Sequence, residues 1–397
     1  MNINILPSEL LLMIFKKLLI TDLKSVMLVC KYWRSMGGDP ILWKKFPVLI
    51  ENPHQFIQVL SIPRLSCLEH ITIDGLYEFN ARYENFHVDF LLERWGVKIL
   101  EIGETADLRN VFPEKLAKLV NKCEIVELGY NLTKRQMREI FSEMSSSVTN
   151  LKKLWLPDDV HHVPADMLAE GLVKIPHITL SNITQKQVMA FFTAMTKDYA
   201  RTIFLNTHTA DLAHLPSSVI SEAAAKLQGL RASLSAGQVS SIMKMLSSTI
   251  TTTMTFLHLG QSDLTMVDPG VLARGLVRVE EVEMMWTRLD TCHIVELVKE
   301  MSKDYCVLKH LQLNHDLTEV PADILAIAIN KLETAGILAC NITQEQTDKI
   351  FTKMSAKTNL KKINYNNLCS PLTMGGIARV QKGSLAKGAD LRKDPDV

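Results

Sequence analysis

One motif that can start a helix recurs five times along this chain, and its spacing constrains the fold more than any other feature. The motif is a proline followed, three positions later, by an apolar residue. Its prolines are spaced 51, 52, 53 and 52 residues apart: Pro113, Pro164, Pro216, Pro269 and Pro321. Proline suits the first turn of a helix, where no N–H donor is needed. A period of about 52 residues predicts a repeat architecture rather than one compact core.

A second motif alternates with the first and also predicts helix starts. In Thr133-Lys134-Arg135-Gln136, a hydroxyl residue precedes glutamine by three positions, a spacing that caps a helix. An amphipathic stretch follows each copy. The five copies end at Gln136, Gln187, Gln238, His293 and Gln346.

Short runs of alternating apolar residues lie between the predicted helices and indicate strands with one buried face. They occupy residues 151–156, 203–205, 256–259, 308–313 and 360–365. Counterparts half a period away occur at residues 126–128, 178–180 and 282–284, and earlier runs at 68–73 and 99–102 are predicted as degenerate first strands. The long period therefore divides into strand–helix units of about 26 residues, which is the leucine-rich-repeat range.

This paired period resembles the ribonuclease-inhibitor type of leucine-rich repeat. The resemblance implies an α/β solenoid, with parallel strands on the concave face of a horseshoe and helices on the convex face. A stack of helical pairs of the HEAT type is the alternative. The runs of Leu-x-x-Leu-x-Leu favour strands over that alternative.

The first fifty residues carry a different pattern of three short helical segments. Pro7 and Ser8 suit a helix start, and six apolar residues from Leu10 to Phe15 would wrap around that helix, which we expect to continue to Leu18 and to be buried on more than one face. Thr21-Asp22 is the expected cap of a second helix, and Lys31 begins a third element. So small and apolar a unit is expected to need a partner.

The order of these residues closely resembles an F-box: Leu6-Pro7-x-Glu9-Leu10-x-x-x-Ile14, then Val29-Cys30-Lys31-x-Trp33-Arg34 and Asp39-Pro40-x-Leu42-Trp43. The resemblance implies a three-helix module that docks on a Skp adaptor and, through it, on a cullin scaffold. The adaptor contacts implied by the matched positions are Leu6, Pro7, Leu10, Ile14, Leu23, Val29, Cys30 and Trp33. Some of these side chains must instead hold the module together, and the pattern does not separate the two roles.

Four regions are predicted from these boundaries. Residues 1–48 are the F-box, residues 49–66 a linker and N-terminal cap, and residues 67–369 the leucine-rich-repeat domain. Residues 370–397 are a degenerate last repeat and a polar tail, because Gly375-Gly376 would weaken its helix.

Composition excludes several classes of partner. The 44 basic and 43 acidic side chains nearly cancel, so no global field favours nucleic acid or an anionic membrane. The seven cysteines lie far apart, which argues against both a disulfide framework and a zinc site. The N-terminus lacks a basic-then-apolar signal, and its apolar run is too short to cross a bilayer, so we expect a cytoplasmic or nuclear protein without membrane contact.

No pattern typical of an active site stands out from the repeats. The sequence has no recognisable Gly-rich phosphate loop, nucleophile elbow or pair of metal-ligating histidines, and we expect no catalytic residue, cofactor or metal. The leading hypothesis is a non-enzymatic substrate receptor of an SCF-type (Skp–cullin–F-box) ubiquitin ligase that binds an unknown protein. A leucine-rich-repeat scaffold outside any ligase is the second hypothesis, and an unrecognised enzyme is the third.

The strand pattern also predicts a recognition surface. In Leu-x-x-Leu-x-Leu, the residue between the last two apolar positions faces away from the core, toward the concave side. The candidates for substrate contact are Trp155, Phe204, His258, Glu283 and Gln312, and further residues at this position are Glu127, Thr179 and Asn364. Trp155 and Phe204 are the strongest, because exposed aromatic residues are favoured binding anchors. A register slipped by one residue would instead bury both rings.

Overall fold

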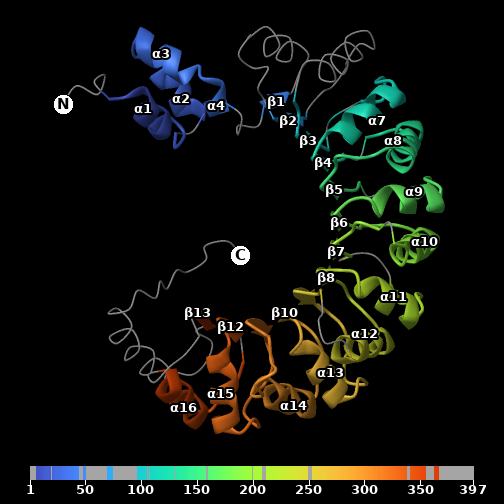
Figure 1. Cartoon of the computed structure of the whole chain (residues 1–397), viewed down its shortest axis with the longest axis vertical. Helices are drawn as coiled ribbons and strands as arrows, with labels where there is room; N and C mark the ends of the chain where they lie inside the picture. The colour runs from blue at the N-terminus through green and yellow to red at the C-terminus, as the bar shows by residue number, and fades with distance from the viewer. Residues whose placement is uncertain are drawn as a thin grey trace. The chain divides into compact units, whose positions relative to one another are not determined.

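The computed structural model, drawn in Figure 1, divides the chain into two compact units, Met1–Phe191 and Phe192–Val397. It describes residues 6–18, 20–43, 48–50, 69–74, 96–104, 106, 108–129, 131–157, 160–198, 200–207, 212–248, 253–337, 340–354 and 362–365. Most of the predicted linker and the whole predicted last repeat and tail lie outside these residues. The four predicted region boundaries stay predictions.

The first unit begins with four short helices: α1 (Ser8–Phe15), α2 (Ile20–Val26), α3 (Lys31–Gly37) and α4 (Pro40–Trp43). Pro7 is the N-cap of α1. At the start of α3, the Cys30 sulfur accepts a hydrogen bond from the backbone N–H of Trp33. Two expectations were wrong. The first helix ends at Phe15, not Leu18, and α2 begins at Ile20, so Thr21-Asp22 lies inside its first turn.

The repeats of the first unit form parallel strands in sequence order. The strands are β1 (Val48–Ile50), β2 (His70–Ile73), β3 (Ile99–Ile102), β4 (Ile125–Glu127), β5 (Lys153–Trp155) and β6 (His177–Thr179). The helices between the later strands are α7 (Pro113–Lys122), α8 (Lys134–Ser146) and α9 (Ala165–Leu172), and α10 (Gln185–Met195) runs across the division.

The second unit repeats this arrangement. Its strands are β7 (Phe204–Asn206), β8 (Gly229–Arg231), β9 (Phe256–His258), β10 (Glu281–Met284), β11 (His310–Leu313), β12 (Thr334–Ile337) and β13 (Lys362–Tyr365), all paired in parallel. Its helices are α11 (Ser217–Ala224), α12 (Ala236–Ser248), α13 (Pro269–Leu276), α14 (Thr291–Met301), α15 (Ala322–Lys331) and α16 (Gln344–Met354). None of the described helices in either unit is long and apolar enough to cross a membrane.

The repeated helix starts and the alternating strand runs are therefore confirmed. Each proline motif opens a helix, and the alternative of a HEAT-type stack of helical pairs is wrong. Three strands were not predicted: β1, β8 and β12. Gly229 in β8 and Gly336 in β12 break the apolar alternation, so these strands are recognisable only from their hydrogen bonds to neighbours. This α/β layout is compatible with a repeat solenoid.

In four of the five repeats that carry the motif, a buried glutamine holds the second helix of the repeat against the loop before the first helix. The side-chain amide of Gln187 donates to the carbonyls of Val160 and Val163, each at 2.8 Å, while its oxygen accepts the Thr184 N–H at 2.9 Å. Gln136, Gln238 and Gln346 make the same three contacts. The sequence predicted the cap. The reach to the preceding loop was not predicted, because those carbonyls are about 25 residues away.

Candidate functional site

Alternation along the strands separates a buried face from an open one. In the second unit Leu205, Leu230, Leu257, Val282 and Leu311 are paired across neighbouring strands and buried. Figure 1 shows the helices of this unit on one side of its strands. Because successive side chains of a strand point to opposite faces, the chain neighbours of these buried residues lie on the other side, which we call the open face. The predicted buried and outward positions are confirmed for β9, β10 and β11.

One row of open-face residues is polar. Asn206, Arg231, His258, Glu283 and Gln312 lie opposite one another on β7 to β11. Three of the predicted candidates, His258, Glu283 and Gln312, fall in this row. The Asn364 position on β13 continues it, although the side chain of Asn364 lies outside the described ones.

Glu283 links three strands through its side chain. Its Oε2 accepts a hydrogen bond from His258 Nδ1 at 2.6 Å and another from Arg231 at 3.1 Å. The bond from His258, followed by the positive charges of His258 and Arg231, outweighs the effect of burial and holds the pKa of the Glu283 carboxyl below its usual value. The open face of the second unit therefore carries an anchored carboxylate beside a cationic side chain that is still about 40% exposed.

Phe204 belongs to a second, aromatic row. The register places Phe204 in one row with Gly229 and Phe256, while Asn206 is in the row of Arg231 and His258. The sequence pattern took Ile203 and Leu205 as the two apolar positions on either side of the outward residue, which made Phe204 equivalent to His258. That prediction was wrong by two residues, because Leu205 is the residue that aligns with Leu257. A shift of two keeps the same face, and Phe204 is half-buried on the open side.

Trp155 lies in the first unit, on β5, between Glu127 on β4 and Thr179 on β6. Its ring is half-buried, and the Lys153 ammonium lies 4.0 Å from the ring centroid. Such a cation–π contact stabilises an exposed pair by about 0.5–1 kcal/mol. The ring is thus held in place and still accessible at one face of the sheet.

An exposed tryptophan that the sequence analysis missed follows β10. Trp286 is 71% exposed and has a φ of 66°, a left-handed conformation that is uncommon for a bulky residue. The backbone N–H of Trp286 donates to the side-chain oxygen of Asn314, just after the next strand, at 3.2 Å. Only the loop geometry distinguishes Trp286 from the buried aromatic residues, so the sequence carried no signal for it.

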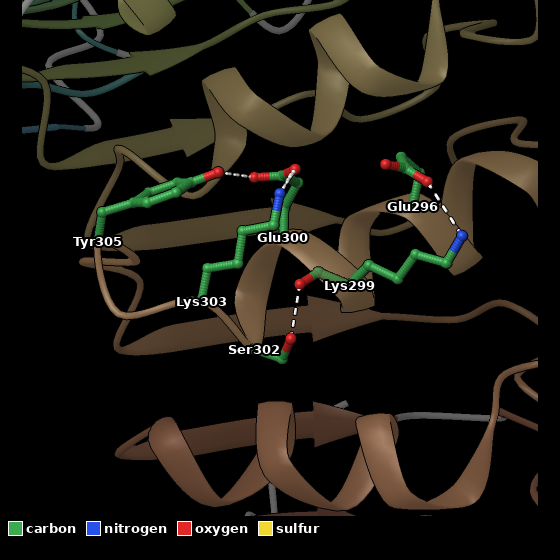
Figure 2. Close-up of polar contacts among 6 residues, drawn as sticks. All are labelled: Glu296, Lys299, Glu300, Ser302, Lys303 and Tyr305. Carbon is green, nitrogen blue, oxygen red and sulfur yellow. Dashed lines mark hydrogen bonds and ion pairs between the residues drawn. The ribbon is translucent and has the colours of Figure 1, made fainter.

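A cluster of polar side chains follows the end of α14 (Figure 2). Glu300 is 3% exposed and accepts hydrogen bonds from Lys303 and the Tyr305 hydroxyl, both of which point toward it. Burial alone would raise the pKa of Glu300, but these bonds and the charges of Lys303 and Arg274 lower it below the usual value. The Arg278 guanidinium lies 4.9 Å from the Tyr305 ring centroid. We interpret this cluster as a structural brace between the turn after α14 and the segment before β10.

The four N-terminal helices enclose a small apolar core. Leu11, Phe15, Leu23 and Leu42 form it, and the Trp33 ring packs edge-on against Phe15 with centroids 5.6 Å apart. Leu6 also packs against this core. Within this chain the first helix therefore buries one side only, and the expected burial of a further face stays a prediction that requires a partner.

The outer side of the same helices is apolar as well. Leu10 and Ile14 of α1 are exposed, and Val29, just before α3, is 64% exposed. Exposed apolar side chains that the sequence analysis did not select are Met13, Leu28, Tyr32 and Ile41. The N-terminal helices and the turns between them thus present several apolar side chains to solvent that a helical module of this size would otherwise bury.

Comparison with known families decides what this N-terminal region is. A family model described as F-box-like matches residues 3–46. The N-terminal region is an F-box-like domain. No curated protein matches the chain.

The eight predicted adaptor contacts fall into three groups by the burial of their side chains in the F-box-like domain. Leu23 is fully buried and belongs to the core of the domain. Leu6, Cys30 and Trp33 are partly buried. Pro7, Leu10, Ile14 and Val29 are exposed, so they are the members of the set that a partner could touch without unfolding the domain.

Proposed function

We propose that this protein is the substrate-recognition subunit of an SCF-type ubiquitin ligase. Its F-box-like domain docks on a Skp adaptor, which connects it to a cullin, and its repeats, of the ribonuclease-inhibitor-like type, bind the protein to be ubiquitinated. The observation that carries the proposal is the exposed apolar surface of Leu10, Met13, Ile14, Leu28 and Val29 on a domain that matches the F-box-like family. F-box domains typically bind such an adaptor.

In this proposal the chain has no catalytic residue and acts by proximity. Holding a substrate near the transferring subunit makes the reaction effectively intramolecular, which is enough to raise its rate. The partner subunits supply the chemistry. In this proposal, substrate recognition takes place in the cytoplasm, the nucleus or both.

The open face supplies the substrate contacts. Trp155 in the first unit, and Phe204, His258, Glu283 and Gln312 in the second, combine aromatic area with fixed charge, which is the composition of binding hot spots. We add Arg231 and Phe256 to this set, because Arg231 shares the Glu283 carboxylate and Phe256 stacks on Phe204.

Co-purification of the full chain with adaptor and cullin tests the docking half. Ile14→Asp combined with Val29→Asp places two charges on the exposed apolar surface and should reduce adaptor capture by roughly thirtyfold or more, since losing interface anchors costs about 2 kcal/mol or more. Val148→Asp is the control, because Val148 is also apolar and exposed but lies outside the domain.

The results separate the ligase from the alternative scaffold. Capture of adaptor and cullin by the unaltered chain and the control, but not by the double variant, supports the proposal. Adaptor without cullin would favour a scaffold that works outside the ligase. Equal capture of the adaptor by the double variant would remove the exposed apolar surface as the docking site.

A further inference from the structure

Three side chains with metal-binding chemistry lie together at the start of α14. Asp290, Cys292 and His293 each offer one ligand atom, and these atoms all lie within 4.8 Å of one another. The three residues provide a carboxylate oxygen, a thiol sulfur and an imidazole nitrogen. Well-separated cysteines in the sequence argued against a zinc site, but that argument addressed only sites built from several cysteines.

His293 replaces the buried glutamine of the other four repeats. It is 2% exposed, and its Nε2 lies 2.7 Å from the carbonyl oxygen of Val267. A carbonyl can only accept, so Nε2 carries the proton and donates it. His293 thus keeps the contact to the preceding loop that the glutamine amide makes elsewhere, and it does so with a ring.

This hydrogen bond determines the state of the other ring nitrogen. In the neutral ring, a proton on Nε2 leaves Nδ1 unprotonated, with its lone pair available. Nδ1 lies 3.6 Å from the Cys292 sulfur. Metal-ligating histidines commonly donate their second nitrogen to a backbone carbonyl, which orients the ring, and Val267 provides that contact here.

The other two ligand groups are reachable from solvent. Asp290 is the N-cap residue of α14, but its side chain makes no capping hydrogen bond, unlike Thr133 or Asp268 at the starts of α8 and α13. Both Asp290 and Cys292 are exposed. The buried histidine and the two exposed groups together form a site with one fixed and two adjustable ligands.

We propose that Asp290, Cys292 and His293 bind a divalent, thiophilic transition metal ion, with zinc as the best fit. Zinc bonds of about 2.0 to 2.3 Å in a tetrahedral arrangement place a sulfur and a nitrogen ligand roughly 3.5 Å apart, close to the observed 3.6 Å. Mixed sulfur, nitrogen and oxygen donors are the set that zinc accepts. Three protein ligands leave a fourth position for water.

Charge balance fits a dication. Binding replaces the thiol proton of Cys292, which leaves to solvent, so the thiolate and the Asp290 carboxylate neutralise the two positive charges of the metal. The N–H groups at the start of α14 favour the thiolate and oppose the cation. We therefore expect binding that strengthens as pH rises, and weaker binding than in four-ligand structural zinc sites.

Cobalt titration of the full chain tests this site, because a Co²⁺–thiolate bond gives a charge-transfer absorption. His293→Gln is the decisive variant: glutamine occupies this position in the other four repeats, so folding should be kept while the nitrogen ligand is lost. We expect Co²⁺ affinity to fall at least about tenfold in His293→Gln, Cys292→Ser and Asp290→Asn, since even the loss of a supporting contact costs that much. Cys306→Ser controls for a cysteine elsewhere in the same unit.

Zinc-dependent stability provides a second measurement. Zn²⁺ should raise the melting temperature of the unaltered chain and of Cys306→Ser, but not that of His293→Gln. Absence of the charge-transfer band from the unaltered chain would overturn the proposal. So would a band, or a zinc-dependent rise in melting temperature, that persists in both Cys292→Ser and His293→Gln.

Discussion

Phe204 and Phe256 stack on the open face with ring centroids 5.4 Å apart and planes inclined by 27°, although a whole strand lies between their own. Gly229 is the residue between them on that strand. A Cβ at Gly229 would lie 2.3 Å from carbons of the Phe204 ring. The absence of a side chain at one position thus brings two aromatic rings together.

Gly229→Ala should therefore destabilise the second unit by about 1–3 kcal/mol, the usual cost of overpacking. Chemical denaturation measures the change. Adding Phe204→Ala should recover most of that loss, because the clash would be gone. Gly96→Ala is the control, since an added Cβ there meets no atom within 4 Å. Equal losses in the single and double variants would show that Gly229 is needed for another reason.

Substrate capture should depend on the open face while folding does not. Trp155→Ala combined with Phe204→Ala removes two half-buried rings, and we expect captured substrate to fall about tenfold or more with only a modest change in melting temperature. Proximity labelling under proteasome inhibition, followed by capture of the labelled partners, provides the measurement. Intact capture by a folded double variant would exclude this surface.

Neighbouring residues on β11 should lose very different amounts of stability on the same substitution. Leu311→Ala removes a buried side chain and should cost about 2–5 kcal/mol of unfolding free energy. Gln312→Ala, on the open face, should cost about 0.5 kcal/mol or less. Equal effects in a denaturation experiment would contradict the strand register.

The F-box-like domain should separate stability from binding in the same way. Leu23→Ala opens the core formed with Leu11 and Phe15, and we expect a loss of about 2–5 kcal/mol in the stability of the domain. Val29→Ala changes an exposed side chain, so it should weaken adaptor binding and leave folding intact. Hydrogen exchange within α1 to α4 measures the first effect, and adaptor titration the second. A binding loss for Val29→Ala that is accompanied by faster exchange would contradict this division.

Acid should weaken the strand network around Glu283. The hydrogen bond from His258 lowers the pKa of Glu283 in the folded chain. The ionised Glu283 carboxylate therefore contributes stability that is fully present above the ordinary glutamate pKa of about 4.3. This contribution is lost as pH falls through the lower pKa of the folded state. The unaltered chain should lose more stability between about pH 6 and pH 3 than Glu283→Gln does. Glu281→Gln, on the same strand, is the control for removing a carboxyl outside this network. Parallel pH profiles for all three proteins would remove Glu283 as a source of the acid dependence.

Local chemistry determined much of the repeat from sequence alone. The repeated motif at Pro269 marks a helix start through the local geometry of proline. The spacing of Leu308, Leu311 and Leu313 indicates a strand with one apolar face, and all three side chains are buried. The F-box pattern likewise followed from the order of its residues. Its apolar side chains could be recognised, but not divided between core and surface.

Tertiary structure decided what depends on distant neighbours. β8 and β12 are strands because the neighbouring strands supply hydrogen bonds, not because of their own residues. The exposure of Val29 and Trp286 depends on which helices and loops pack nearby. His293 shows the same limit: its place in the repeat was visible in the sequence, but the state of its ring depends on the Val267 carbonyl, 26 residues earlier, which only the folded chain brings within 2.7 Å.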